Sequence, residues 1–378
     1  MKHAIRIRNG VAASVLTVLL GGATALVAGC SGLGYYAQAA QGQMSLLSEA
    51  RPIDDWLADA SVDAKLKTRL AHVKEIRQYA ARELGLPDNG SYKNYADLKR
   101  QFVLWNVVAT PPLSLRPTQW CFPVAGCVSY RGYYSKDQAQ AAATALRDAG
   151  EDVELAGVPA YSTLGWFNDP VMSTFIQYPD AELARLIFHE LAHQVVYAKG
   201  DSQFNESFAT AVEEVGVERW LEAHGDAKMR TAYAEHEARK SDFLALLQKA
   251  RAAALINYAS DASDQQKLEQ KKRIFATLQD DYQLQKQKWG GYAGYDRWFS
   301  QPLNNAHLAA VATYHDFVPG FKALLNQQKK NFGKFYAAVK QLAELDKSTR
   351  QQRLIQLGQS APMMAGVTTN KAALTAQP

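Results

Sequence analysis

The pattern of residues from Pro179 to about Lys347 is almost entirely helical, and this stretch constrains the fold more than any other feature of the chain. Apolar residues recur there at the three- and four-residue spacing of a buried helix face. The breaks fall at glycines and one proline: Gly200, Gly225, residues 290–294 and Pro302. The sequence therefore predicts a mainly helical protein.

Segments typical of β-strands lie between residues 101 and 178. They are rich in β-branched and aromatic residues and occupy 102–108, 127–134, 151–155 and 161–167. A helical segment at 136–148 interrupts them. We therefore expect an α+β fold with a small mixed or antiparallel sheet.

The chain shows no internal repeat and no linker that would divide it. We expect one domain over residues 30–357, with a helical part at 31–100 before the strands and the long helical part at 179–357 after them. The small-residue-rich tail at 358–378 is predicted to be disordered.

The first 29 residues have the form of a signal peptide. Lys2, Arg6 and Arg8 precede an apolar stretch that ends in small residues directly before Cys30. This ending resembles a bacterial lipobox, which implies that Cys30 is lipidated and anchors the mature chain on the periplasmic side of a membrane. Ser31 after the cysteine favours the outer membrane. The alternative is an uncleaved N-terminal anchor helix.

Cys121 and Cys127 flank a short Pro- and Gly-containing segment. In an oxidising periplasm two thiols so close in sequence are predicted to form a disulfide. The alternative, a pair of metal-binding thiolates, lacks further cysteines to complete the site, because the chain has 3 cysteines and Cys30 is one of them.

The net charge argues against a nucleic-acid partner. The formal charge is +5, and three of these charges lie in the acid-free first 29 residues, so the remainder carries +2. A balance so near zero gives no electrostatic attraction to phosphates.

Residues 189–193 read His-Glu-Leu-Ala-His on a predicted helix. His189 and His193 are four residues apart, so they project from one helix face and can converge on one cation. Glu190 lies about 100° round the helix and can act on a water molecule at that cation. This arrangement predicts a metal site with Glu190 as general base.

A second predicted helix begins after Asp201 and carries Glu206 and Glu213. An antiparallel helix after a short turn would bring Glu206 back to the histidines. Two imidazoles and one carboxylate leave a fourth position open, which is the arrangement of catalytic zinc. Glu213, on the same face, could be the alternative ligand or could accept an N–H from a ligating histidine.

The strings His-Glu-Leu-Ala-His and Asn205-Glu206 resemble the zincin metallopeptidases whose third ligand is a glutamate. Thr210 stands where those enzymes often carry an acid. Strings at 121–127, 130–133, 162–167, 204–209 and 304–308 resemble the putative aminopeptidase family of bacterial lipoproteins. The resemblance implies a zincin-like fold, one Zn²⁺ per chain and a peptide substrate.

The expected reaction is hydrolysis of a peptide bond. Zinc held by the three ligands would activate water, and Glu190 would pass its proton to the leaving amine. Tyr314 and His315 are candidates to stabilise the oxyanion. Equally, they could be the polar rim of an amphipathic helix.

The segment Ser162, Thr163, Leu164, Gly165 and Trp166 is predicted to be an edge strand along which an extended peptide pairs. Two other functions remain open from the sequence: a zinc hydrolase acting on a non-peptide amide such as cell-wall material, and a catalytically idle zincin-fold binding lipoprotein. The sequence does not predict an oligomeric state.

Overall fold

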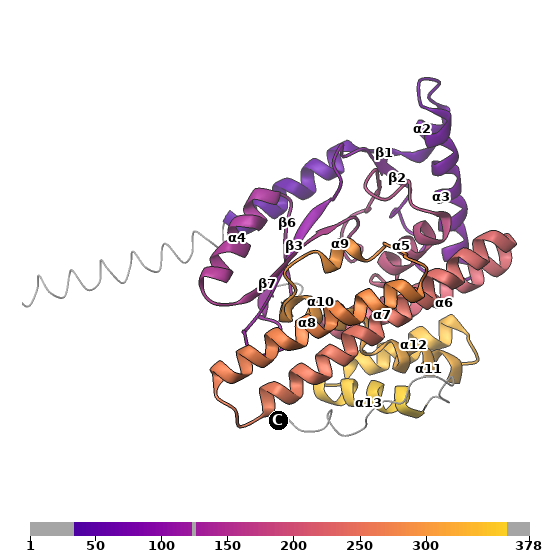
Figure 1. Ribbon diagram of the computed structural model, residues 1–378. Coiled ribbons are helices and arrows are strands. Elements are labelled where there is room, and N and C mark those ends of the chain that lie inside the picture. Colours follow the sequence, from indigo (N-terminus) through magenta and orange to yellow (C-terminus); the bar gives the residue numbers. More distant parts are fainter. Residues whose placement is uncertain (1–33, 123–125, 361–378) are drawn as a thin grey trace, which may run out of the picture. The chain divides into compact units, whose positions relative to one another are not determined.

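The computed structural model describes residues 34–122 and 126–360 (Figure 1). The predicted signal peptide at 1–29, lipidated Cys30 and most of the predicted tail lie outside these ranges. Contacts divide the chain into two units, Met1–Glu49 and Ala50–Pro378. The described part of the first unit is a helix over residues 34–49. No helix within the described ranges has the length and apolar character needed to span a membrane.

The predicted α+β class, mainly helical with a small sheet, is confirmed. The sheet with the longest strands has three of them in the order β6-β3-β7: β6 (Arg131–Tyr133), β3 (Leu104–Thr110) and β7 (Asp152–Val158). Both pairings are antiparallel. In the β3–β7 ladder Asn106 lies opposite Ala156, and Val108 lies opposite Glu154. Because side chains alternate along strands, these four residues share one face of the sheet.

Helices cover this sheet. Helix α4 (Lys136–Asp148) begins at the N-cap Ser135 and packs against β3, β6 and β7. Helix α10 (Asn305–His315), about 150 residues further along the chain, also packs against β3 and β7 (Figure 1). It brings Thr313, Tyr314 and His315 to the same cavity as the sheet face defined above.

Two smaller sheets flank the first. One is mixed, with β1 (Ala50–Pro52) antiparallel and β8 (Val171–Met172) parallel to β2 (Asn94–Ala96). Residues 31–100, expected to be helical, thus contain two short strands besides α2 (Ile53–Ala58) and α3 (Ala64–Arg82). The other is the hairpin β4 (Trp120–Phe122) and β5 (Gly126–Val128).

The predicted disulfide is present in this hairpin. Cys121 and Cys127 face each other across the β4–β5 pair and are joined by a disulfide bond. Gly126, with φ +77°, packs against the Gly200 turn that separates the two helices of the metal motif. A Cβ on Gly126 would lie 2.7 Å from the Gly200 nitrogen. The close packing therefore requires a glycine there.

The predicted strand at 161–167 is wrong, because this segment is a turn. Leu164 and Gly165 have positive φ values of 58° and 82°, which a strand does not allow. Asp169 holds the turn by accepting from the N–H and the hydroxyl of Thr163, each at 2.8 Å. Trp166 is exposed, and none of residues 162–166 lines the cavity at the metal motif.

The remaining helices follow one another in the second half of the chain, as predicted. Helices α7 (Ala227–Ala259) and α8 (Asp264–Lys288) form a long packed pair (Figure 1). The others are α5 (Asp180–Ala192), α6 (Ser202–His224), α9 (Asp296–Phe299), α11 (Val318–Gln327), α12 (Phe332–Glu344) and α13 (Lys347–Ser360). Residues 358–360, expected to begin the disordered tail, belong to α13.

Candidate metal centre and active site

Helix α5 carries the histidine motif and is almost entirely buried. Pro179 is its N-cap, and the acids Asp180 and Glu182 lie in the first turn, where the helix dipole favours negative charge. The sequence predicts a break in the helical pattern at Gly200, but the helix already ends at Ala192, and His193 is its C-cap. The helix stops because the N–H groups of the two residues after His193 donate to carbonyls only three residues back, those of Leu191 and Ala192, and so form tight turns.

The connection to α6 is compact because Asn205 holds it. The Asn205 side chain accepts a hydrogen bond from the N–H of Ala198 at 2.7 Å and donates to its carbonyl at 2.9 Å. Asn205 is buried, and these two bonds give its side-chain oxygen and nitrogen a partner each, the N–H and the carbonyl of Ala198. Asn205 therefore fixes the loop that leaves His193 at the point where Glu206 begins to face it.

Helix α6 starts at the predicted cap. Asp201 is the N-cap, and its side chain accepts from the N–H of Phe204. Asp201 is fully buried and forms an ion pair with Arg350 of α13. Because α6 is buried on nearly every side, it cannot shift relative to α5 without disturbing the core.

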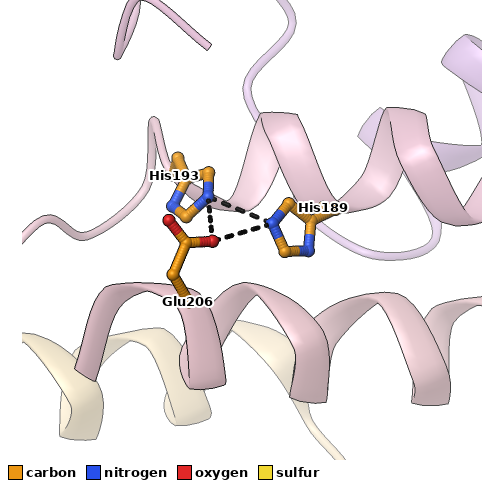
Figure 2. A group of neighbouring side chains, drawn as sticks. All are labelled: His189, His193 and Glu206. Atoms are coloured by element: carbon orange, nitrogen blue, oxygen red, sulfur yellow. Dashed lines mark hydrogen bonds and ion pairs between the residues drawn. The ribbon is translucent and has the colours of Figure 1, made fainter. Parts of the chain in front are cut away.

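Three donor atoms from these two helices form a small triangle. Figure 2 shows the rings of His189 and His193 pointing from the end of α5 toward Glu206, which points back from α6. His189 Nε2 lies 3.2 Å from His193 Nε2 and 3.3 Å from Glu206 Oε2, and His193 Nε2 lies 3.4 Å from the same oxygen. All three residues are buried, and together they form a possible metal site.

The triangle fits tetrahedral zinc. Zinc bonds of roughly 2.0–2.1 Å at tetrahedral angles place neighbouring ligand atoms about 3.3 Å apart. The three edges measured here, 3.2, 3.3 and 3.4 Å, match that separation. The donor set of two imidazoles and one carboxylate is also the set found in hydrolytic zinc sites with an open fourth position.

Glu213 lies behind the triangle. Its Oε2 accepts a hydrogen bond from His189 Nδ1 at 2.8 Å, on the side of the ring opposite Nε2. This bond places a proton on Nδ1 and directs Nε2 at the triangle, where it can hold either a second proton or a metal ion. Arg185 donates to both Glu213 oxygens, at 3.1 and 3.2 Å, and holds the carboxylate in place.

The surrounding charges favour a positive charge at the triangle. Burial alone would lower the pKa of His189, but the charge of Glu213 and the hydrogen bonds that Glu206 and Glu213 accept from the ring outweigh burial and raise the pKa to about 10. Burial likewise opposes ionisation of Glu206, but its interactions with His193 and His189 lower its pKa to about 2. A proton or a metal cation would be stabilised by the same two carboxylates.

Glu190 and Tyr314 lie beside the triangle. Glu190 is buried, and burial raises its pKa despite the nearby histidines. The Tyr314 ring stacks on His189, with centroids 6.2 Å apart. Tyr314 is 36% exposed, and the charge of Glu206 raises its pKa well above the usual value, so its hydroxyl keeps its proton. His315 follows on α10, where burial lowers its pKa to about 4 and the ring is neutral at pH 7.

A cavity of about 520 Å³ opens onto this cluster. His189, Glu190, Tyr314 and His315 line it, and so do residues of the sheet face. Sequence reasoning did not identify Asn106, Glu154 or Arg185, which also line the cavity. An acid alternating with apolar residues in the strand 152–158 was the available signal for Glu154.

The chain matches a known protein family over residues 34–354. That family is described as "Aminopep: Putative aminopeptidase". No curated protein and no solved structure matches the chain. Because the match covers most of the sequence, including the triangle and the cavity, the chain belongs to the putative aminopeptidase family.

Proposed function

We propose that this protein is a zinc-dependent peptidase that removes residues from the N-terminus of peptides. The observation that carries the proposal is the triangle of His189, His193 and Glu206, whose edges suit zinc. His189 also lines the cavity, as does Glu190. Zinc bound there supplies Lewis-acid chemistry: it polarises a carbonyl group and makes water more acidic.

Glu190 is proposed to move the protons. Its burial raises its pKa, which brings the carboxyl group closer to the neutral range in which a group can both accept and release a proton. It would take a proton from the attacking water and give it to the departing amine.

Tyr314 is proposed to stabilise the oxyanion. Its hydroxyl remains protonated, its ring lies against His189, and it lines the cavity. It can therefore donate a hydrogen bond to negative charge that develops on the carbonyl oxygen. His315 is neutral at pH 7 and could donate only through one ring N–H.

The test compares wild-type protein with Glu190→Gln on a panel of free and N-blocked peptides and non-peptide amides, with and without chelator. The variant should keep stoichiometric zinc and lose hydrolysis by several orders of magnitude, since it loses the proton acceptor but no ligand. Wild-type protein that binds no zinc, or zinc-loaded protein that cleaves only non-peptide amides or nothing, would refute the proposal.

The N-terminal sequence supports a location for this activity. We propose that Cys30 carries lipid and tethers the enzyme to the periplasmic side of a membrane, with the outer membrane favoured. Labelling with a fatty-acid probe should disappear in Cys30→Ser. Labelling that persisted in this variant would exclude Cys30 as the anchor.

A further inference from the structure

The cavity contains a carboxylate whose role the proposed reaction leaves unassigned. Glu154 projects from β7, is 9% exposed and lines the cavity with His189 and Glu190. Its Oε2 is buried without a hydrogen-bond partner, and no ion pair to its side chain occurs, among the described residues. Burial, unopposed by any neighbouring charge, raises its pKa to about 7.

The other acids that line the cavity have positive or hydrogen-bonding neighbours. Arg185 bonds both Glu182 and Glu213, and His189 and His193 lie near Glu190. Lys240, the cavity's remaining basic residue apart from its histidines, forms an ion pair with Glu214. Basic side chains of the protein therefore lie beside the other acids of the cavity. The positively charged partner of Glu154 is expected to be part of a bound ligand.

A second acceptor lies on the neighbouring strand. Asn106 of β3 lines the same cavity, and its Oδ1 is buried with no hydrogen-bond partner in the described ranges. The register places Asn106 two residue pairs away from the Val108–Glu154 pair, which puts it on the same face of the sheet as Glu154. An ammonium group offers three N–H donors and no acceptor, which is what two unpartnered oxygens require.

Apolar side chains surround these two acceptors. They belong to β3, β7, the segment after β7, and α5: Val108, Ala156, Val158, Pro159, Ala160 and Leu186. Such walls suit an uncharged substrate side chain. The positive charge that Glu154 receives then comes from the main chain of the substrate, whose α-amino group has an ordinary pKa near 7.7–8.0.

We propose that Glu154, with Asn106 beside it, binds the protonated α-amino group of the substrate peptide. This inference rests on the proposed function, and it assigns the residue that makes the enzyme an exopeptidase. An N-acetylated peptide has no charge at that position and would leave the buried carboxylate unpaired, so it is a poor substrate.

The experiment compares Glu154→Gln with wild-type protein, using L-leucine 4-nitroanilide and its N-acetyl derivative. The variant should lose about 10²-fold or more in kcat/KM on the free substrate, as expected for a buried ion pair with one partner removed. The ratio of free to acetylated substrate should fall by the same factor. An equal loss on both substrates, or no loss on the free one, would overturn the proposal.

Glu151→Gln is the matched control. It makes the same acid-to-amide change three residues earlier, and Glu151 lines a different cavity and accepts from Thr118. It should leave the substrate ratio unchanged. Zinc content and thermal unfolding of both variants show whether the metal centre and the fold are intact, and Glu154→Asp should recover part of the preference for the free amine.

A binding measurement separates this inference from the proposed function. Leucinol carries the amino group but no bond that a peptidase could cleave, so calorimetry with zinc-loaded protein measures recognition alone. Wild-type protein should bind leucinol, and Glu154→Gln should bind it at least tenfold more weakly, with N-acetyl-leucinol weak for both. If leucinol binds in this way but no peptide is cleaved, the proposed function fails and the amine site stands. Equal leucinol binding by the two proteins would refute the site even if peptides are cleaved.

Discussion

Glu213 Oε2 accepts a hydrogen bond from His189 Nδ1 at 2.8 Å, whereas Glu206 Oε2 lies 3.3 Å from the other ring nitrogen of the same histidine. The two glutamates of α6 thus contact opposite edges of one imidazole ring. Glu206 belongs to the possible metal site, and Glu213 orients the ring of His189 from the other side.

The first prediction separates these two positions. Glu206→Gln should lose zinc at chelator concentrations where Glu213→Gln still holds most of it, because removal of an orienting carboxylate typically costs about 10–100-fold in affinity and removal of a ligand costs more. Chelator competition followed by elemental analysis measures the order. A reversed order would assign Glu213 as the ligand.

The second prediction concerns the loop between the helices. Asn205→Ala removes both hydrogen bonds to Ala198 and leaves its buried N–H without a partner, whereas its carbonyl still accepts from the N–H of Asp201, so the change should destabilise the protein by about 1–3 kcal/mol and weaken zinc binding. Asn205→Asp keeps only the acceptor of the Ala198 N–H, so its stability should lie between those of wild-type protein and Asn205→Ala. Denaturant unfolding with and without zinc is the measurement, and an unchanged midpoint in Asn205→Ala would contradict the role given to this side chain.

The third prediction assigns the oxyanion donor. Tyr314→Phe should lower kcat by about 10²-fold with little change in KM, since the lost hydrogen bond forms only as charge develops. His315→Gln is the comparison on the same helix and should have the smaller effect. Steady-state kinetics on one peptide decides, and a larger loss in His315→Gln would transfer the role to His315.

The fourth prediction uses the buried carboxylate of β7. The pKa of Glu154 rises from its ordinary 4.5 to about 7 in the folded protein. Between these values the folded state holds a proton that the unfolded state has released, so this group makes stability fall as pH rises from about 4.5 to 7. Above pH 7 the cost is at most about 3 kcal/mol.

Glu154→Gln removes that cost. The variant should therefore be more stable than wild-type protein at pH 8 and close to it at pH 4. Denaturant unfolding at the two pH values gives the comparison. A variant that is less stable at pH 8 would mean that Glu154 has a favourable partner in the folded protein.

The sequence was sufficient to predict the mainly helical fold and the helices that carry His189, His193 and Glu206, because helical periodicity and motif spacing are local properties. The disulfide was also predicted, since Cys121 and Cys127 are close in sequence. The end of α5 at Ala192 was not predicted, because the tight turns that end the helix and the Asn205 contact with Ala198 depend on tertiary structure. The turn at 161–167 was mistaken for a strand, because its aromatic residues favour strands while Asp169 and positive φ values fold it back.

The cavity lining was beyond prediction from sequence for a different reason. Glu154 and Asn106 come together through the register of β3 and β7, and Tyr314 reaches the same cavity from α10, about 150 residues after β7 in the chain. Contacts between residues so far apart in sequence produce no periodic pattern in the amino-acid sequence. Arg185 lies on the motif helix itself, but its bond to Glu213 requires the packing of α5 on α6.

The metal triangle has a further consequence for how the chain folds. All three donors come from residues 189 to 206, so they meet as soon as α5 and α6 form one helical hairpin. Closing a loop of this length costs little conformational entropy, and the cost does not depend on the distant strands or the C-terminal helices. A metal ion bound at this stage would stabilise the hairpin, whose helix α6 packs against α10 and α11. The centre proposed for catalysis would thus also act as an early folding nucleus.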